Sequence, residues 1–312
     1  MKKYFPIIGS IIVVTVASYF VVTTKGKEKA KTKTVKIAPE NIGKFSRQRS
    51  CARPPRFLRK SNIPQPVLID LSQQRFKGLA MHYGKNYEKS LHPDLWGKYE
   101  HFSTYTVDEY GNLYLVPMPF ISINENTFDL QKNIYKLNSE TGDLEIFMHL
   151  EDVRASSNNP YGLNSIAYDC DDKTLWVSAV DESDYKNQKG VIYHIDPVNK
   201  SILDTIEGFD VLSMAIIKSE KGKYLLLGSA RDNGLYSYKM NSNILDQKPK
   251  KLFSLPSANQ HIRKIKIKGN NQLELQAIPF TYSLISQTEK KHRVFYNAIW
   301  IDTLRKWKLN SA

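Results

Sequence analysis

The stretch that decides the fold is Asp169-Cys-Asp-Asp-Lys-Thr-Leu-Trp-Val-Ser-Ala-Val180, followed after a gap by Val191-Ile-Tyr-His-Ile-Asp196. It reads as a tight polar turn, a β-rich segment, a gap and a further strand that carries a tyrosine. The same order recurs three more times in the chain. The four polar turns are expected at residues 108–112, 169–173, 219–223 and 268–272. A unit built only from short strands and repeated in this way is typical of a β-propeller blade.

The strands on either side of these turns support the repeat. β-rich segments follow the turns at 112–119, 174–180, 223–230 and 272–279. Further strands are expected at 133–137, 191–196, 234–238 and 294–301, where Tyr135, Tyr193, Tyr236 and Tyr296 hold equivalent places. Successive tyrosines lie 58, 43 and 60 residues apart. A single blade cannot bury both of its faces, so several must pack around an axis, and we interpret the tyrosines as packing residues between neighbouring sheets.

The net charge of +14 is concentrated at one end of the chain. Residues 1–61 contain 15 Lys and Arg and only two acidic residues, Glu28 and Glu40. Residues 62–312 contain 30 basic and 29 acidic residues, so this part is almost neutral. It therefore lacks the broad basic face that a nucleic-acid backbone would need, and we expect no nucleic-acid partner.

The N-terminus predicts a membrane segment. Residues 5–24 are uncharged and rich in Ile and Val, and about 20 helical residues span a hydrocarbon layer of roughly 30 Å. We expect residues 1–24 to be an uncleaved signal anchor, with a cleaved signal peptide near Val16-Ala17-Ser18 as the alternative. The lysines after the segment outnumber Lys2 and Lys3, which on the positive-inside count would keep the domain in the cytoplasm. We favour export because a short N-terminus with its own lysines rarely crosses the membrane.

The rest of the chain divides into two parts. Residues 25–61 are basic, proline-containing and poor in apolar periodicity, which predicts a disordered linker that could also lie against anionic lipid. Residues 62–312 are expected to form the propeller, with an early strand at 67–71 completing the C-terminal blade and closing the ring. Residues 72–98 leave room for one degenerate blade, giving five or six in total. Cys51 and Cys170 are too few and too differently placed to predict a disulfide framework.

The second repeat resembles a known group of propellers. Its Asn159-Pro-Tyr-Gly-Leu-Asn-Ser-Ile-Ala-Tyr-Asp169 and Leu175-Trp-Val177 are similar to the blades of six-bladed gluconolactonase/senescence-marker and NHL-type proteins. Asp108-Glu-Tyr-Gly-Asn-Leu-Tyr-Leu115 fits the same pattern. The resemblance covers about residues 105–301. It consists of the strand and turn pattern that propeller blades share in general, so it implies the fold more than an activity.

Enzymes of that group hold a divalent cation at the channel mouth with one Glu, two Asn and one Asp. The resemblance places the equivalent positions eight residues before each turn's glycine position, at Ser103, Asn164, Met214 (or its neighbour Ser213) and Arg263. Only Asn164 reproduces a ligand. A calcium site needs six or more oxygen ligands, so these residues do not predict one.

The loops that enter each blade and that join its second and third strands gather on one face of a propeller. On that face we expect a binding site for a small molecule or a peptide at the channel mouth. The candidate ligand-binding residues are Asn164, Asp181, Arg231, Asp232 and His261.

Two functions of different classes follow from these observations. The first is a membrane-tethered or exported, non-enzymatic propeller of a bacterial envelope that acts as a binding or scaffold protein without a cofactor. The second is a metal-dependent, lactonase-like hydrolase with displaced ligands, in which a divalent cation such as calcium polarises a carbonyl group. Metal that co-purifies with the domain would separate the two.

Overall fold

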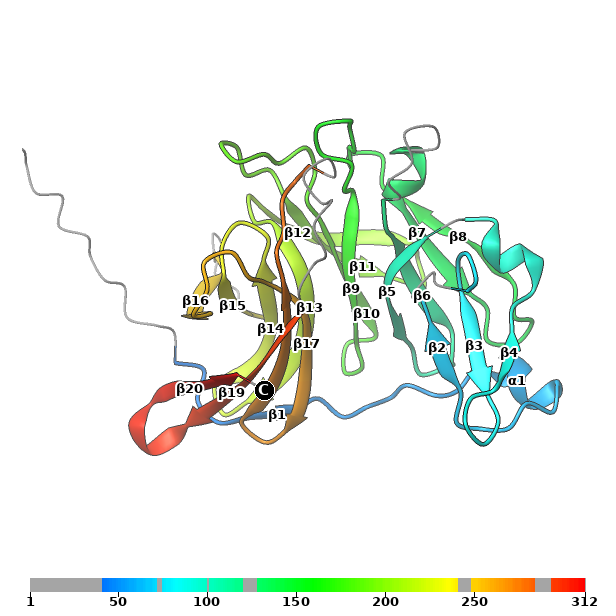
Figure 1. Ribbon diagram of the computed structural model, residues 1–312, viewed down its shortest axis with the longest axis horizontal. Coiled ribbons are helices and arrows are strands. Elements are labelled where there is room, and N and C mark those ends of the chain that lie inside the picture. The colour runs from blue at the N-terminus through cyan, green and yellow to red at the C-terminus, as the bar shows by residue number, and fades with distance from the viewer. Residues whose placement is uncertain are drawn as a thin grey trace, which may run out of the picture. The chain divides into compact units, whose positions relative to one another are not determined.

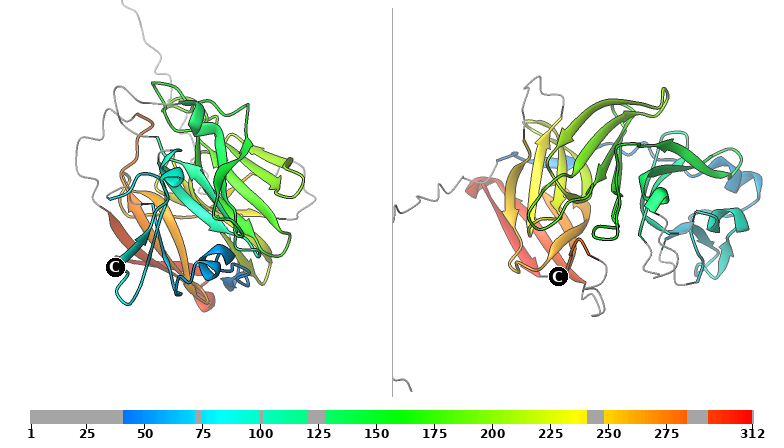
Figure 2. Two further views of the ribbon diagram at one scale, coloured as in Figure 1. Left: turned by 90° about the vertical axis from the view of Figure 1, so that its right-hand side faces the viewer. Right: turned by 90° about the horizontal axis from the view of Figure 1, so that it is seen from above.

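In the computed structural model, which describes residues 41–71, 75–99, 101–119, 128–240, 248–283 and 293–311, five antiparallel sheets form a β-propeller arrangement. Figures 1 and 2 show the sheets side by side in chain order, and we number them as blades from the N-terminus. All described residues belong to one unit, Pro39–Ala312. The prediction of an all-β propeller is confirmed, and five blades are seen.

The elements have the following bounds. The first blade contains β2 (Leu68–Asp70), β3 (Ala80–Tyr83) and β4 (Lys89–Leu91). The second contains β5 (Phe102–Val107), β6 (Leu113–Pro117), β7 (Asn133–Leu137) and β8 (Leu144–His149). The third contains β9 (Leu163–Asp169), β10 (Thr174–Ala179), β11 (Val191–Asp196) and β12 (Ser201–Glu207).

The fourth blade contains β13 (Val211–Ser219), β14 (Gly222–Ser229), β15 (Gly234–Lys239) and β16 (Lys250–Ser254), and β1 (Phe45–Arg47) joins it beside β13. The fifth contains β17 (His261–Gly269), β18 (Gln272–Ile278), β19 (Val294–Ile301) and β20 (Lys306–Ser311). The helices are short: α1 (Arg56–Lys60), and the 3-10 helices η1 (Asp94–Gly97), η2 (Phe128–Lys132) and η3 (Asp302–Leu304).

The four predicted polar turns all connect the first two strands of a blade, and each contains one residue with positive φ. These residues are Gly111, Lys173, Gly222 and Asn271. In the turn of the second blade, the Asp108 carboxylate accepts hydrogen bonds from the backbone N–H groups of Tyr110 and Asn112, both at 2.9 Å. We call the end of the propeller that carries these turns the turn face, and the opposite end the loop face.

The core lies between the blades. Four clusters of buried side chains each combine residues of two consecutive blades, because a propeller sheet can bury its two faces only against its neighbours. Three of the recurring tyrosines, Tyr135, Tyr193 and Tyr296, are buried in these clusters as predicted. Tyr236 is half-buried, and its hydroxyl donates a hydrogen bond to Asp232 at 2.8 Å.

The predicted closing strand pairs elsewhere. β2 pairs with β3, so the early strand starts the first blade, while β17–β20 complete the fifth blade without it. The prediction that residues 67–71 complete the C-terminal blade is therefore wrong. A partner only about ten residues away costs much less loop-closure entropy than one more than 200 residues away. Residues 72–98 do contain strands β3 and β4 of a further, degenerate blade.

Residues 41–60, which we call the strap, cross the turn face from the fifth blade to the second (Figure 1). The Phe45 N–H donates to Asn271 Oδ1 at 2.8 Å, and the Gln48 side chain donates to the Tyr168 carbonyl at 2.9 Å. Further along, the Phe57 N–H donates to the Ser139 carbonyl at 2.8 Å. Gly111 is needed here, since a Cβ on it would lie 2.8 Å from the Pro54 carbonyl oxygen.

The strap overlaps the predicted disordered linker, 25–61. Residues 41–61 contain β1 and α1, and four of their apolar side chains, Ile42, Phe45, Phe57 and Leu58, are buried between blades. The strap also forms a disulfide between Cys51 and Cys170 of the third-blade turn. The sequence did not predict this bond, because the two cysteines are 119 residues apart and are brought together only where the strap crosses the third blade. Residues 1–24 lie outside the described residues.

Candidate functional site

The axial channel of the propeller contains a cavity of about 360 Å³. The inner strands β5, β9, β13 and β17 line it, and Arg47 and Gln48 of the strap lie at its turn-face end. Four of the lining residues are cationic, namely Arg47, Arg263, Lys264 and Lys266, and of these Lys266 also pairs with Glu274 at 3.9 Å. No Asp or Glu is among the described residues that line it. Because Coulomb attraction strengthens as water is excluded, this channel favours an anion.

Arg263 lies at the loop-face end of this cavity. Its Nη1 donates to the Leu212 carbonyl at 2.8 Å, and its Nη2 donates to Ser103 Oγ of β5. The guanidinium therefore extends from the fifth blade to the second. Arg263 is half-buried, and burial of its guanidinium among protein atoms lowers the pKa of Arg263. It has no ion pair with any described carboxylate, and an arginine remains charged under such conditions.

The strand-start positions named by the sequence resemblance converge around the guanidinium of Arg263. Ser103 Oγ donates to the backbone carbonyl of Asn164 at 2.9 Å, and Ser213 Oγ donates to the Ile262 carbonyl at 2.7 Å. Asn164 is 4% exposed, and its Nδ2 donates to the Val211 carbonyl at 3.4 Å. A cationic guanidinium thus stands among the positions that hold a metal in the resembling enzymes. This donor set, with one cation and no carboxylate, does not fit a calcium ion.

Two of the other predicted residues, Arg231 and Asp181, form hydrogen bonds that hold the loop of residues 180–190 in place. The Arg231 guanidinium donates to the backbone carbonyls of Asp184 and Tyr185, the latter at 2.7 Å. Asp181 Oδ1 accepts a hydrogen bond from the Arg154 N–H at 2.7 Å. Burial raises the pKa of the Asp181 carboxyl. Both side chains therefore already hold backbone groups of the loop face.

Asp232 and His261 occupy the same end of the fourth and fifth blades. The Asp232 carboxylate accepts from Lys251 Nζ at 2.6 Å and from Tyr236 at 2.8 Å. Burial pushes the pKa of Asp232 upward, but these hydrogen bonds outweigh it and the net shift is downward. His261 is 8% exposed and packs edge-on against Phe280, and its Nδ1 has no hydrogen-bond partner. The five predicted residues do not converge on one point.

His261 should make stability fall in weak acid. Burial lowers the pKa of His261 below its usual 6.5, and the nearby charge of Asp232 only partly opposes this. The unfolded chain then takes up the proton first, so stability is lost as pH falls below about 6.5, by up to about 1.4 kcal/mol per pH unit. We expect His261→Phe to reduce this loss. Urea unfolding at about pH 7.5 and about pH 5.5 measures it, and identical pH dependence in both proteins would contradict it.

The sequence reasoning missed a buried carboxylate beside these residues. Asp210 is fully buried and accepts hydrogen bonds from Ser183 Oγ at 2.6 Å, the Gly190 N–H at 2.8 Å and the Tyr282 hydroxyl at 2.5 Å. Burial raises the pKa of Asp210, with these hydrogen bonds opposing it. Around it lies an apolar cluster of Tyr161, Val180, Leu212, Ala230, Phe280 and Tyr282. The loop face over the third to fifth blades is therefore packed.

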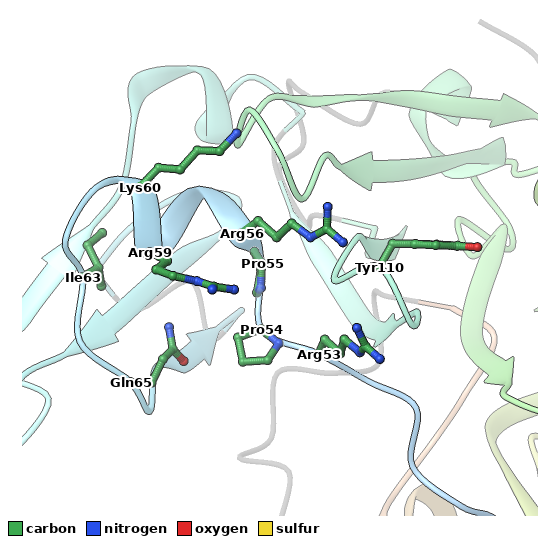
Figure 3. A pocket seen from close by; sticks show the side chains of 9 residues that line it. All are labelled: Arg53, Pro54, Pro55, Arg56, Arg59, Lys60, Ile63, Gln65 and Tyr110. Atoms are coloured by element: carbon green, nitrogen blue, oxygen red, sulfur yellow. The ribbon is translucent and has the colours of Figure 1, made fainter.

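A larger groove of about 910 Å³ lies on the turn face, between α1 and the turn of the second blade. Figure 3 shows Arg53, Arg56 and Arg59 reaching into it, with Tyr110 on the other side. Arg56 and Lys60 are both paired with Glu140, at 2.6 Å and 3.0 Å. Arg53 and Arg59 form no ion pair with another described residue. The strap residues that line the groove were predicted to belong to the disordered linker, so the groove was not predicted.

Two further kinds of feature, a metal-binding cluster and a membrane-spanning helix, are not found among the described residues. Across the part of the chain that the structure describes, no group of three or more His, Cys, Asp or Glu residues is placed to hold a metal ion. In the same residues, no helix has the length and apolar character needed to cross a membrane. The predicted segment, 5–24, is outside that part of the chain.

Comparison with known proteins supplied no family. No family model matches the chain, and no curated protein matches it. Among solved structures, it is similar to a chain in a S. cerevisiae assembly of a Dbp5 variant bound to Nup159, a Gle1 variant, IP6 and ADP. The identity is 13% and the TM-score is 0.37, over 88% of this chain and 69% of that chain.

Proposed function

We propose that this chain is an exported, membrane-tethered and non-catalytic propeller of the cell envelope that binds a small anionic ligand in its axial channel. The observation that carries the proposal is the charge of the channel. Arg263 presents a guanidinium there without a carboxylate partner, and Arg47, Lys264 and Lys266 line the same cavity. Arg263 is half-buried and the other three are exposed, so charge-assisted hydrogen bonds to an anion in the channel would come mainly from Arg263.

Export is supported by the disulfide. Cys51–Cys170 ties the strap to the third blade, and disulfides of this structural kind persist mainly in oxidising compartments such as the periplasm. The tether itself rests on residues 5–24 and on the lysines that follow them. Residues 62–312, together with the strap, would then lie outside the cytoplasm.

The channel predicts a clear effect of one substitution. Arg263→Gln removes the charge while keeping a polar side chain, and a charge-assisted hydrogen bond contributes about 1.5–3 kcal/mol. We expect the affinity for small anions to fall at least about tenfold. Calorimetric titration of the full-length chain in detergent with inorganic phosphate, sulfate and citrate measures this.

Arg154→Gln is the matched control, because Arg154 is exposed on the loop face and lies outside the channel. Binding that is equal in all three proteins, or absent in the unmodified chain, would contradict the proposal. Tight Ca²⁺ binding in place of anion binding would instead favour the lactonase-like hydrolase. Under that alternative, this chain would be more closely related to the gluconolactonase and NHL-type propellers.

A further inference from the structure

The strap carries an excess of cations that the turn face does not neutralise. Residues 41–61 contain seven basic residues and no acidic residue. Three of them have acidic partners: Lys44 with Glu220 and Asp302, and Arg56 and Lys60 with Glu140. The other four are exposed and form no ion pair with a described residue. They are Arg47, Arg49, Arg53 and Arg59.

The nearby acidic side chains of the turns are engaged by lysines of the blades. Glu109 pairs with Lys173 at 2.9 Å, and Asp171 pairs with Lys218 at 2.9 Å. The four unpaired arginines are exposed, and Arg53 interacts with the charge of Glu109 only through space and forms no ion pair with it. They are spread along an extended segment that crosses four blades, and do not converge on one point. Such a line of cations fits many phosphates arranged on a surface better than one small ligand.

Two of the four unpaired arginines lie together in the groove between α1 and the turn of the second blade. Arg53 and Arg59 line it from the strap, and Tyr110, which is 56% exposed, lines it from the turn of the second blade (Figure 3). An amphipathic aromatic side chain beside cations is characteristic of the interface between lipid and water. An exposed tyrosine and two unpaired guanidinium groups thus share one open groove.

We propose that the groove of Arg53, Arg59 and Tyr110 binds the phosphate headgroups of anionic lipids and holds the turn face against the membrane. This inference rests on the proposed membrane tether. Only residues 25–40 separate the tether from the strap, and 16 residues reach at most about 55 Å. The strap is thereby kept within reach of a surface of phosphates. The turn-face end of the channel, at Arg47, would then open toward the lipid.

The test uses the full-length chain in nanodiscs of phosphatidylcholine alone or of an equimolar mixture with phosphatidylglycerol. We expect amide hydrogen exchange in residues 53–63 to slow at least about fivefold in the anionic discs only, since one well-placed arginine contributes about that factor near an anionic leaflet. Arg53→Glu with Arg59→Glu should abolish the slowing. Arg154→Glu with Lys186→Glu makes the same charge change at exposed loop-face positions and should preserve it.

Equal protection in both kinds of disc, or protection lost equally in the control variant, would overturn the inference. Protection in phosphatidylcholine discs on addition of inorganic phosphate would assign the groove to a free anion and would also overturn it. If neither disc retains the chain, the tether has failed and the groove is tested by sedimentation with vesicles of the same two compositions. Co-sedimentation with anionic vesicles alone, weakened about 30-fold by the two groove substitutions, then sustains it.

Discussion

Replacing Cys51 and Cys170 together with serine is expected to lower the free energy of unfolding by about 4–5 kcal/mol. The disulfide closes a loop of 119 residues, and in the chain-entropy view such a loop restricts the unfolded chain strongly. It also fixes the strap to the third blade, where Gln48 exchanges hydrogen bonds with the backbone of Tyr168 and Cys170. Urea unfolding of the oxidised chain and of the double variant measures the difference.

A second measurement connects this prediction with the location of the protein. A chain exported to an oxidising compartment should show no thiol that reacts with maleimide when it is taken directly from cells and unfolded. Addition of a reductant before labelling should reveal two reactive thiols. An unchanged urea midpoint in the double variant would contradict the stabilising role, and two reactive thiols without reductant would contradict export.

The parts of the fold that depend on local pattern were predictable. The four turns, the strands around them and the burial of Tyr135, Tyr193 and Tyr296 follow from a repeat that each blade carries within itself. The period of a strand and the polarity of a turn are local properties. Five blades were within the predicted range for the same reason.

The strap was not predictable because its structure is made entirely by distant contacts. Its apolar residues are few and separated by arginines and prolines, so composition indicates a linker. They are buried only because the turn face offers them pockets between blades, as for Phe57 against Trp96. The pairing of β1 with β13 joins residues at least 170 positions apart, which no local pattern encodes.

The candidate site was predictable only in part. The alignment of turns correctly brought Ser103, Asn164 and Arg263 together at the axis, because equivalent positions of inner strands meet there. The loop-face residues were chosen by type, and both already have partners: Arg231 in the loop of residues 180–190 and Asp232 on β16. The cationic channel depends on how β17 is placed against the other inner strands, which the Lys and Arg residues of 263–268 do not reveal alone.

Asp210→Ala is expected to destabilise the domain by about 3–5 kcal/mol. The change would leave three buried donors without an acceptor: Ser183 Oγ, the Gly190 N–H and the Tyr282 hydroxyl. Each buried donor that loses its partner costs about 1–3 kcal/mol. Two of the donors, Ser183 and Gly190, belong to the loop of residues 180–190, so the loss should also loosen residues 183–190. Urea unfolding and amide hydrogen exchange of that loop measure the two effects.

Asp210→Asn is the matched variant that separates hydrogen bonding from charge. Its Oδ1 can still accept from Ser183 and Gly190, and its Nδ2 can donate to the Tyr282 oxygen, so each group keeps a partner. Because burial raises the pKa of Asp210, the carboxylate is the costly form, and its stability contribution falls as pH rises above about 3.8. We therefore expect the asparagine variant to lose less than about 1.5 kcal/mol at neutral pH. Equal losses in the alanine and asparagine variants would show that the negative charge, acting on Arg231, holds the loop face together instead of the three hydrogen bonds.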